Sequence, residues 1–210
     1  LIPGIDFCVT PALNDLKVIT DIHSHDVRLL ISSPDHKLYA GFSETIGLDR
    51  GKAGLGGLYL YDVKDEHCEK VIDGTFHQIV DTGTGYYVAE ENRGVCKISK
   101  QFELIDSFGQ EPSMKPHGIA YWPERNIVFL GNTSFDKVSA YDENTHELLF
   151  EISLSAKWEK DGRPHHWLND LCVWDGYLYI SMFSHSGADG HGVYDGGILQ
   201  VDLEDHNNRY

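Results

Sequence analysis

A short pattern of polar and apolar positions occurs four times along this chain. Each copy has a polar head residue, an apolar side chain two positions later and usually another two positions after that. The copies cover residues 24–29, 76–80, 116–123 and 168–173, and their heads are His25, His77, His117 and Asn169. Since alternate side chains of a strand point to opposite faces, the pattern predicts four β-strands, each with a buried face.

Each head strand is followed by further strand-like segments. A second strand is expected at 38–40, 86–89, 127–130 and 178–181, and a third at 57–62, 94–98, 137–142 and 197–202. The first three copies also show a fourth at 69–72, 103–107 and 148–154. Heads that are 52, 40 and 52 residues apart match the blade length of a β-propeller.

The repeat therefore predicts an all-β protein, a β-propeller with about four recognisable four-stranded antiparallel blades. We expect a single propeller domain over residues 1–210. It would consist of a leading segment, 1–23, and blades at about 24–74, 75–111, 112–162 and 163–210. Each blade would bury both sheet faces against its neighbours, so all its strands need apolar residues.

The third copy carries a family resemblance. Its Pro116-His117-Gly118-Ile119-Ala120 run, followed by Val138-Ser139-Ala140-Tyr141-Asp142, resembles a repeat of the YVTN and NHL propeller superfamily, which includes lactonase-like propellers. The fourth copy, with Asn169-Asp170-Leu171 and residues 192–197, is similar to an uncharacterised bacterial branch of propellers. Such propellers usually have six or seven blades, so the resemblance favours a chain that is part of a larger ring over a ring that closes unusually early.

Charge and cysteine content narrow the partners and the compartment. The 33 Asp and Glu against 17 Lys and Arg give a net charge of -16, which disfavours nucleic acid and membrane surfaces as partners. The four cysteines form no CxxC pair, and no basic-plus-apolar signal segment is visible. These features favour reduced thiols and a cytoplasmic location.

Residues at equivalent positions of propeller blades converge near the central channel. We therefore expect His25, His77 and His117 to lie at one height, where three imidazoles could hold Zn²⁺ or a similar divalent ion. Asn169 shares that tier as a ligand-binding residue, and the next tier holds Asp26 and Gln78 for ligand binding and Asp170 as a catalytic group. Two alternatives stay open: a metal-free polar binding funnel, and histidines that only bridge strands by hydrogen bonds, which is the commoner role.

The segment before the fourth head offers a second cluster. His165, His166 and Trp167 would form a loop over the same mouth, where Trp167 could stack on a sugar ring and His166 could act as a base. The alternative is an exposed loop with Trp167 covering the core. The Glu90-Glu91-Asn92 run, which follows a second strand, is a minor candidate for a glycosidase-like acid.

Two functions follow from these groups. The first is a binding module that recognises a small polar or carbohydrate ligand, or a protein partner, at the channel mouth. The alternative is a metal-dependent lyase or hydrolase, in which His117, His166 and Asp170 are the catalytic residues. Loss of turnover on chelation would support the enzyme, and ligand binding that is indifferent to a chelator would support the module.

Overall fold

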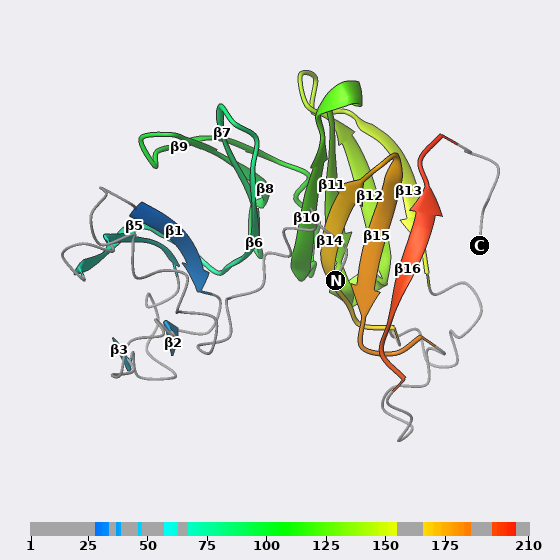
Figure 1. Ribbon diagram of the computed structural model, residues 1–210, viewed down its shortest axis with the longest axis horizontal. Coiled ribbons are helices and arrows are strands. Elements are labelled where there is room, and N and C mark those ends of the chain that lie inside the picture. The colour runs from blue at the N-terminus through cyan, green and yellow to red at the C-terminus, as the bar shows by residue number, and fades with distance from the viewer. Residues whose placement is uncertain are drawn as a thin grey trace. The chain divides into compact units, whose positions relative to one another are not determined.

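The computed structural model describes residues 28–33, 37–38, 46–47, 57–62, 67–154, 166–185 and 195–204. The chain forms two compact units, residues 1–74 and 75–210, and each is described by itself. Almost every described element is a β-strand (Figure 1). In the part of the chain that is described, no helix is long and apolar enough to cross a membrane.

The first unit contains two small antiparallel sheets. Strands β1 (Arg28–Ser33), β4 (Gly57–Asp62) and β5 (His67–Asp73) form a sheet in the order β1-β4-β5. Strands β2 (Lys37–Leu38) and β3 (Ile46–Gly47) pair only with each other. The second strand predicted at 38–40 therefore does not lie between the first and third strands of its repeat.

The second unit follows the predicted repeat closely. Its three sheets are antiparallel meanders, β6-β7-β8-β9, β10-β11-β12-β13 and β14-β15-β16. The first sheet has β6 (Phe76–Asp81), β7 (Gly85–Glu90), β8 (Gly94–Ser99) and β9 (Leu104–Phe108). The second has β10 (Pro116–Trp122), β11 (Ile127–Asn132), β12 (Lys137–Asp142) and β13 (Leu148–Ser153). The third has β14 (Leu168–Trp174), β15 (Tyr177–Met182) and β16 (Gly197–Asp202).

Two 3₁₀ turns, η2 (Pro123–Arg125) and η3 (Thr133–Phe135), connect strands of the middle sheet. The Asn132 side chain accepts a hydrogen bond from Ser134 N and so caps the start of η3. At the end of η3, Asp136 adopts a left-handed conformation with φ of 45°. Asp136 also contacts the segment before β14, which is described below.

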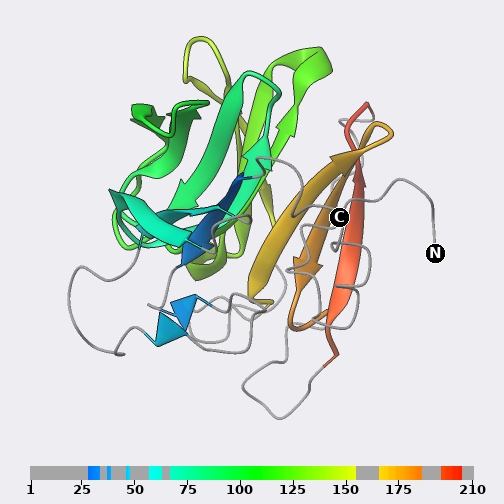
Figure 2. The ribbon, with the colours of Figure 1, turned by 60° about the vertical axis from the view of Figure 1, so that its left-hand side comes forward.

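The middle sheet, β10 to β13, buries both faces. On one face, Ile119, Val128 and Leu130 pack against Tyr87 and Val95 of the first sheet. On the other face, Ala120, Phe129 and Ala140 form a cluster with apolar residues of the third sheet, including Leu171, Leu178 and Ile180. Successive residues of one strand, such as Val128 and Phe129, thus face different neighbours, as the period of two requires. Figures 1 and 2 show this sheet between the other two.

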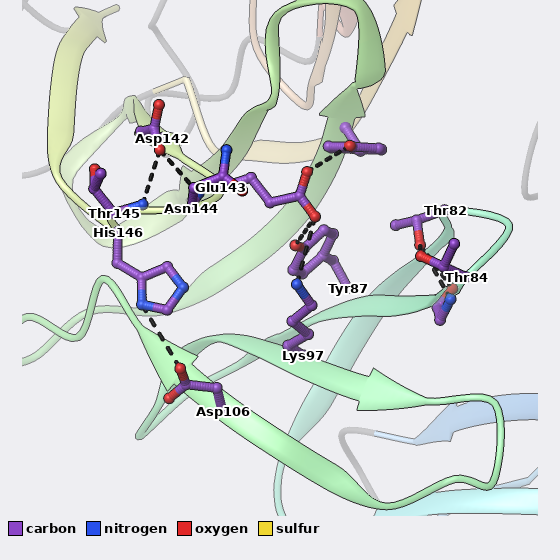
Figure 3. A network of polar contacts seen from close by, with 12 residues as sticks. Thr82, Thr84, Tyr87, Lys97, Asp106, Asp142, Glu143, Asn144, Thr145 and His146 are labelled. Carbon is purple, nitrogen blue, oxygen red and sulfur yellow. Dashed lines mark hydrogen bonds and ion pairs between the residues drawn. The ribbon is translucent and has the colours of Figure 1, made fainter.

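A polar network joins the β6–β9 sheet to the β10–β13 sheet around Glu143, which directly follows β12 (Figure 3). Glu143 accepts hydrogen bonds from the hydroxyls of Tyr87 at 2.7 Å and Tyr121 at 2.5 Å, and its carboxylate lies 3.5 Å from the Lys97 ammonium. Burial alone would raise the pKa of Glu143, but the two hydroxyls and Lys97 outweigh it and hold the pKa below its ordinary value. Burial and the bond to Glu143 raise the pKa of Tyr121 to about 12. The network therefore fixes the distance between neighbouring sheets through a carboxylate that stays ionised.

Candidate functional site

Each first strand of the second unit carries a β-bulge at its polar head. The register of β6 against β7, of β10 against β11 and of β14 against β15 shifts once, near the start of the first strand. The shifts leave these residues without a ladder partner: His77 and Gln78 in β6, His117 in β10, and Asn169 and Asp170 in β14. A bulge frees a residue from ladder pairing and changes the direction of its side chain. The polar heads of the repeat lie at these bulges, where a side chain can point away from the sheet.

The heads of three successive first strands meet. The imidazoles of His77 and His117 stack with ring centroids 4.2 Å apart and an interplanar angle of 22°. Nδ1 of His117 lies 3.2 Å from Oδ1 of Asn169. Three of the four predicted head residues are thus in contact, and the fourth, His25, lies outside the described residues.

Two carboxylates extend this contact at its ends. Glu91, in the turn between β7 and β8, places Oε1 3.4 Å from Nε2 of His77. At the other end, Nδ2 of Asn169 donates to Oδ2 of Asp170 at 3.1 Å. We call the resulting set the polar row: Glu91, His77, His117, Asn169 and Asp170.

Burial sets the proton affinities within the polar row. Desolvation, with a smaller contribution from the charge of His117, lowers the pKa of His77 to about 3, so this ring is neutral at pH 7. Burial raises the pKa of Asp170, and the nearby His117 opposes that rise. The row therefore contains a neutral imidazole and a carboxylate whose pKa is raised above its ordinary value.

Gln78 lies beside the row but points into the protein. Its Oε1 accepts from Ile119 N at 2.8 Å and from Leu171 N at 3.0 Å, and its Nε2 donates to Leu171 O at 2.8 Å. The first strands β10 and β14 approach so closely that a Cβ added to Gly118 would lie 2.7 Å from Asn169 O. One side chain thus bridges the edges of both strands. Its predicted role was ligand binding, and the structure places its polar atoms on backbone groups.

The segment before β14 is held by the η3 turn. The buried Asp136 carboxylate accepts from His166 N at 2.7 Å and from Leu168 N at 3.5 Å, and the Thr133 hydroxyl donates to Leu168 O. The His166 ring is buried, with Nδ1 3.0 Å from Ser184 O and with Nε2 unpaired. His166 is therefore not presented at the surface as predicted for a base on an open loop.

Three aromatic side chains around this segment face solvent. Phe135 is 41% exposed, Trp167 43% and Phe183 60%. Phe183 N donates to Trp167 O at 3.2 Å, and the bonds from Asp136 fix η3 beside the same segment. Trp167 belongs to neither apolar core cluster of the second unit. We call these three residues the aromatic patch.

Some predicted site residues lie outside the described residues, namely His25, Asp26 and His165. Within the ranges that the structure describes, no group of three His, Cys, Asp or Glu side chains is arranged to hold a metal ion. The predicted set of His25, His77 and His117 includes one residue outside those ranges, so divalent metal binding stays a prediction.

Comparison with known proteins bears on the fold. No family model matches the chain, and no curated protein matches it. Among solved structures it is similar to Sqt1 of Saccharomyces cerevisiae, with a TM-score of 0.53 and 8% sequence identity over 85% of this chain. Sqt1 has a propeller-type fold. This chain, too, is a β-propeller.

Two further structures match with lower TM-scores. The computationally designed Ika4 protein has a TM-score of 0.44 and 11% identity, over 70% of this chain and 79% of that one. The N-terminal domain of Nup159 has a TM-score of 0.49 and 10% identity, over 85% of this chain and 43% of that one. The propeller described here spans 42% of the length of Sqt1.

Sequence reasoning missed two features of the site. Phe135 and Phe183 gave no periodic signal, because each lies in a connection between strands of a blade, outside the repeat that the alignment followed. The sequence predicts Glu91 only as part of the acidic run at 90–92, whereas its carboxylate lies against His77 at one end of the polar row. The turn after the second strand of a blade comes back to the head of the first, which could have linked these two residues.

Proposed function

We propose that this propeller is a binding module that docks a protein partner on the polar row and the aromatic patch. The aromatic patch carries the proposal. Three large aromatic side chains are exposed at the end of the unit where the first strands begin. Aromatic residues are enriched at protein interfaces, and exposed apolar groups that lie together often mark a binding surface.

The scaffold beneath the patch supports the same function. The buried Asp136 carboxylate and the Thr133 hydroxyl fix the backbone around Trp167 before any partner arrives. A surface ordered in advance loses less conformational entropy on binding. The polar row adds hydrogen-bonding groups at the head of the neighbouring first strands, which would orient the partner.

We also propose a superfamily for the chain and keep two alternatives, one for the ligand and one for the function. The third repeat supports placing the chain among the YVTN and NHL propellers. A small polar or carbohydrate ligand is an alternative occupant, since Trp167 presents an aromatic face on which a sugar ring could stack. The metal-dependent lyase or hydrolase is an alternative function, which requires His25 to join His77 and His117.

Quantitative affinity capture from cell extract would test the module. A Trp167→Ala/Phe183→Ala double variant should lose the proteins that the wild type retains. The matched control is Leu148→Ala/Leu149→Ala, which removes two exposed apolar side chains from the outer strand β13. Equal losses from the two double variants, or no loss from either, would show that the aromatic patch is not the binding surface.

A further inference from the structure

The hydrogen bonds of the polar row determine which of its groups can donate. Oδ2 of Asp170 accepts a hydrogen bond from the amide nitrogen of Asn169 at 3.1 Å. Oδ1 of Asn169 must then face His117, and Nδ1 of His117 carries the proton that binds it. Among the described residues, Nε2 of His117 has no hydrogen-bond partner.

Donor and acceptor roles are also defined at the Glu91 end of the polar row. The Glu91 carboxylate accepts, so Nε2 of His77 carries the proton of its neutral ring and Nδ1 is a lone pair. Among the described residues, the only buried side-chain nitrogen or oxygen without a partner is Nε2 of His166. The free nitrogens of His77 and His117 are therefore not sealed from solvent.

Most of the remaining hydrogen-bonding capacity of the row belongs to acceptors. Two carboxylates and the Nδ1 lone pair of the neutral His77 ring accept hydrogen bonds, and the second amide N–H of Asn169 is left to donate. In the described part of the chain, no Lys or Arg forms an ion pair with Glu91 or Asp170. A ligand that satisfies these acceptors has to donate, and two carboxylates with no Lys or Arg partner among the described residues favour a cation.

We infer that the polar row receives an arginine side chain of the protein partner. This inference rests on the proposed function. A guanidinium has five N–H donors and no acceptor, carries a permanent positive charge, and can stack its plane on aromatic rings. Lysine offers fewer donors from a single point and cannot stack in this way. The net charge of -16 would attract a basic segment over a longer range.

The test uses the tripeptide acetyl-Gly-Arg-Gly-amide and the ring nitrogen NMR signals of His77 and His117. Binding with a Kd of about 1 mM should shift both rings. The citrulline tripeptide, which has nearly the same shape but no charge, should bind at least about tenfold more weakly, and the lysine tripeptide should bind more weakly than the arginine one.

Two variants locate the binding to the row. Asp170→Asn and Glu91→Gln should each weaken the arginine tripeptide by about tenfold, and the second keeps the test valid if the first perturbs the bulge. Glu124→Gln, which changes an exposed carboxylate in η2, is the control and should have no effect. The inference fails if citrulline or lysine binds as well as arginine, if glucose shifts the rings more strongly, or if no tripeptide shifts them.

Tripeptide binding and partner capture test the arginine site and the protein-docking surface separately. The Trp167→Ala/Phe183→Ala variant should lose the protein partner yet still bind the arginine tripeptide. If the partner is captured through the aromatic patch but the tripeptide does not bind, the module stands and the arginine assignment is wrong. If the tripeptide binds but capture is indifferent to the patch, the proposed protein surface is wrong.

Discussion

Gln78 should be the polar side chain on which the packing of the first strands most depends. Replacing it with Met keeps a similar unbranched volume and removes all three of its hydrogen bonds to the backbone. Ile119 and Leu171, whose N–H groups lose their acceptor, are both buried. Water therefore has poor access to the groups left unpaired.

The loss in free energy of unfolding follows from the backbone groups that Gln78→Met leaves unpaired. An orphaned buried donor costs about 1–3 kcal/mol, so two donors and one carbonyl give an expected loss of about 3 kcal/mol. That is a large share of the roughly 5–15 kcal/mol by which a domain is stable. With a urea m-value of about 1.5 kcal/mol/M, the unfolding midpoint should fall by about 2 M.

Urea unfolding followed by tryptophan fluorescence measures this change in the relevant unit. All four tryptophans lie in the second unit, so the signal reports its unfolding. The matched control is Gln200→Met on β16, where the side chain is exposed and donates only to the Tyr179 hydroxyl at 3.2 Å. It should change stability by less than about 0.5 kcal/mol. If Gln78→Met cost no more than this control, water would be replacing the bridge and the account of first-strand packing would be wrong.

Three further predictions follow from the same contacts. Gly118→Ala should cost about 2 kcal/mol because its Cβ would meet Asn169 O at 2.7 Å, whereas Gly197→Ala, with its nearest contact at 3.4 Å, should cost much less; comparable urea midpoints would contradict this. Glu143 has a lowered folded pKa, so its stabilisation is present above the unfolded value and is lost as the pH falls through the folded one. Glu143→Gln should therefore lower stability by about 1 kcal/mol at pH 7, with the gap to wild type closing in acid; a gap independent of pH would refute the ionised network. If the predicted divalent site exists, elemental analysis should find about one metal ion per chain that His117→Ala removes, and an unchanged metal content would sink that site.

The fold was predictable to the extent that side chains alternate. Val128 and Phe129 pack against different neighbouring sheets, because successive side chains of a strand point to opposite faces. Both faces of the middle sheet are buried, so both positions must be apolar, and the sequence shows this. The separate pairing of β2 with β3 was not predictable, because strands of two residues carry too few side chains to specify a partner.

The site was predictable only in part. Aligning the polar heads correctly indicated that His77, His117 and Asn169 would meet, since equivalent positions of successive repeats lie side by side. The same column could not show that Gln78 turns inward, because that depends on which backbone N–H groups are free at the edges of β10 and β14. Nor could it show the bulges, which arise from how two strands pair.

The exposed aromatics were the least predictable feature. Sequence patterns identify buried faces, and Phe135 follows no period that separates a surface aromatic from a core one. Phe135 lies near Trp167 because the adjacent Asp136 ties η3 to the segment that contains Trp167. Long-range hydrogen bonds of this kind leave no local signal.

Photo-crosslinking from the aromatic patch would test the central claim most directly. Benzoylphenylalanine placed at Phe183 should crosslink to a bound protein partner, because this side chain is 60% exposed beside Trp167. The same probe placed at Leu149, which is 48% exposed on β13, should not. Crosslinks from Phe183 alone are the predicted result, and crosslinks from Leu149 with none from Phe183 would contradict the account.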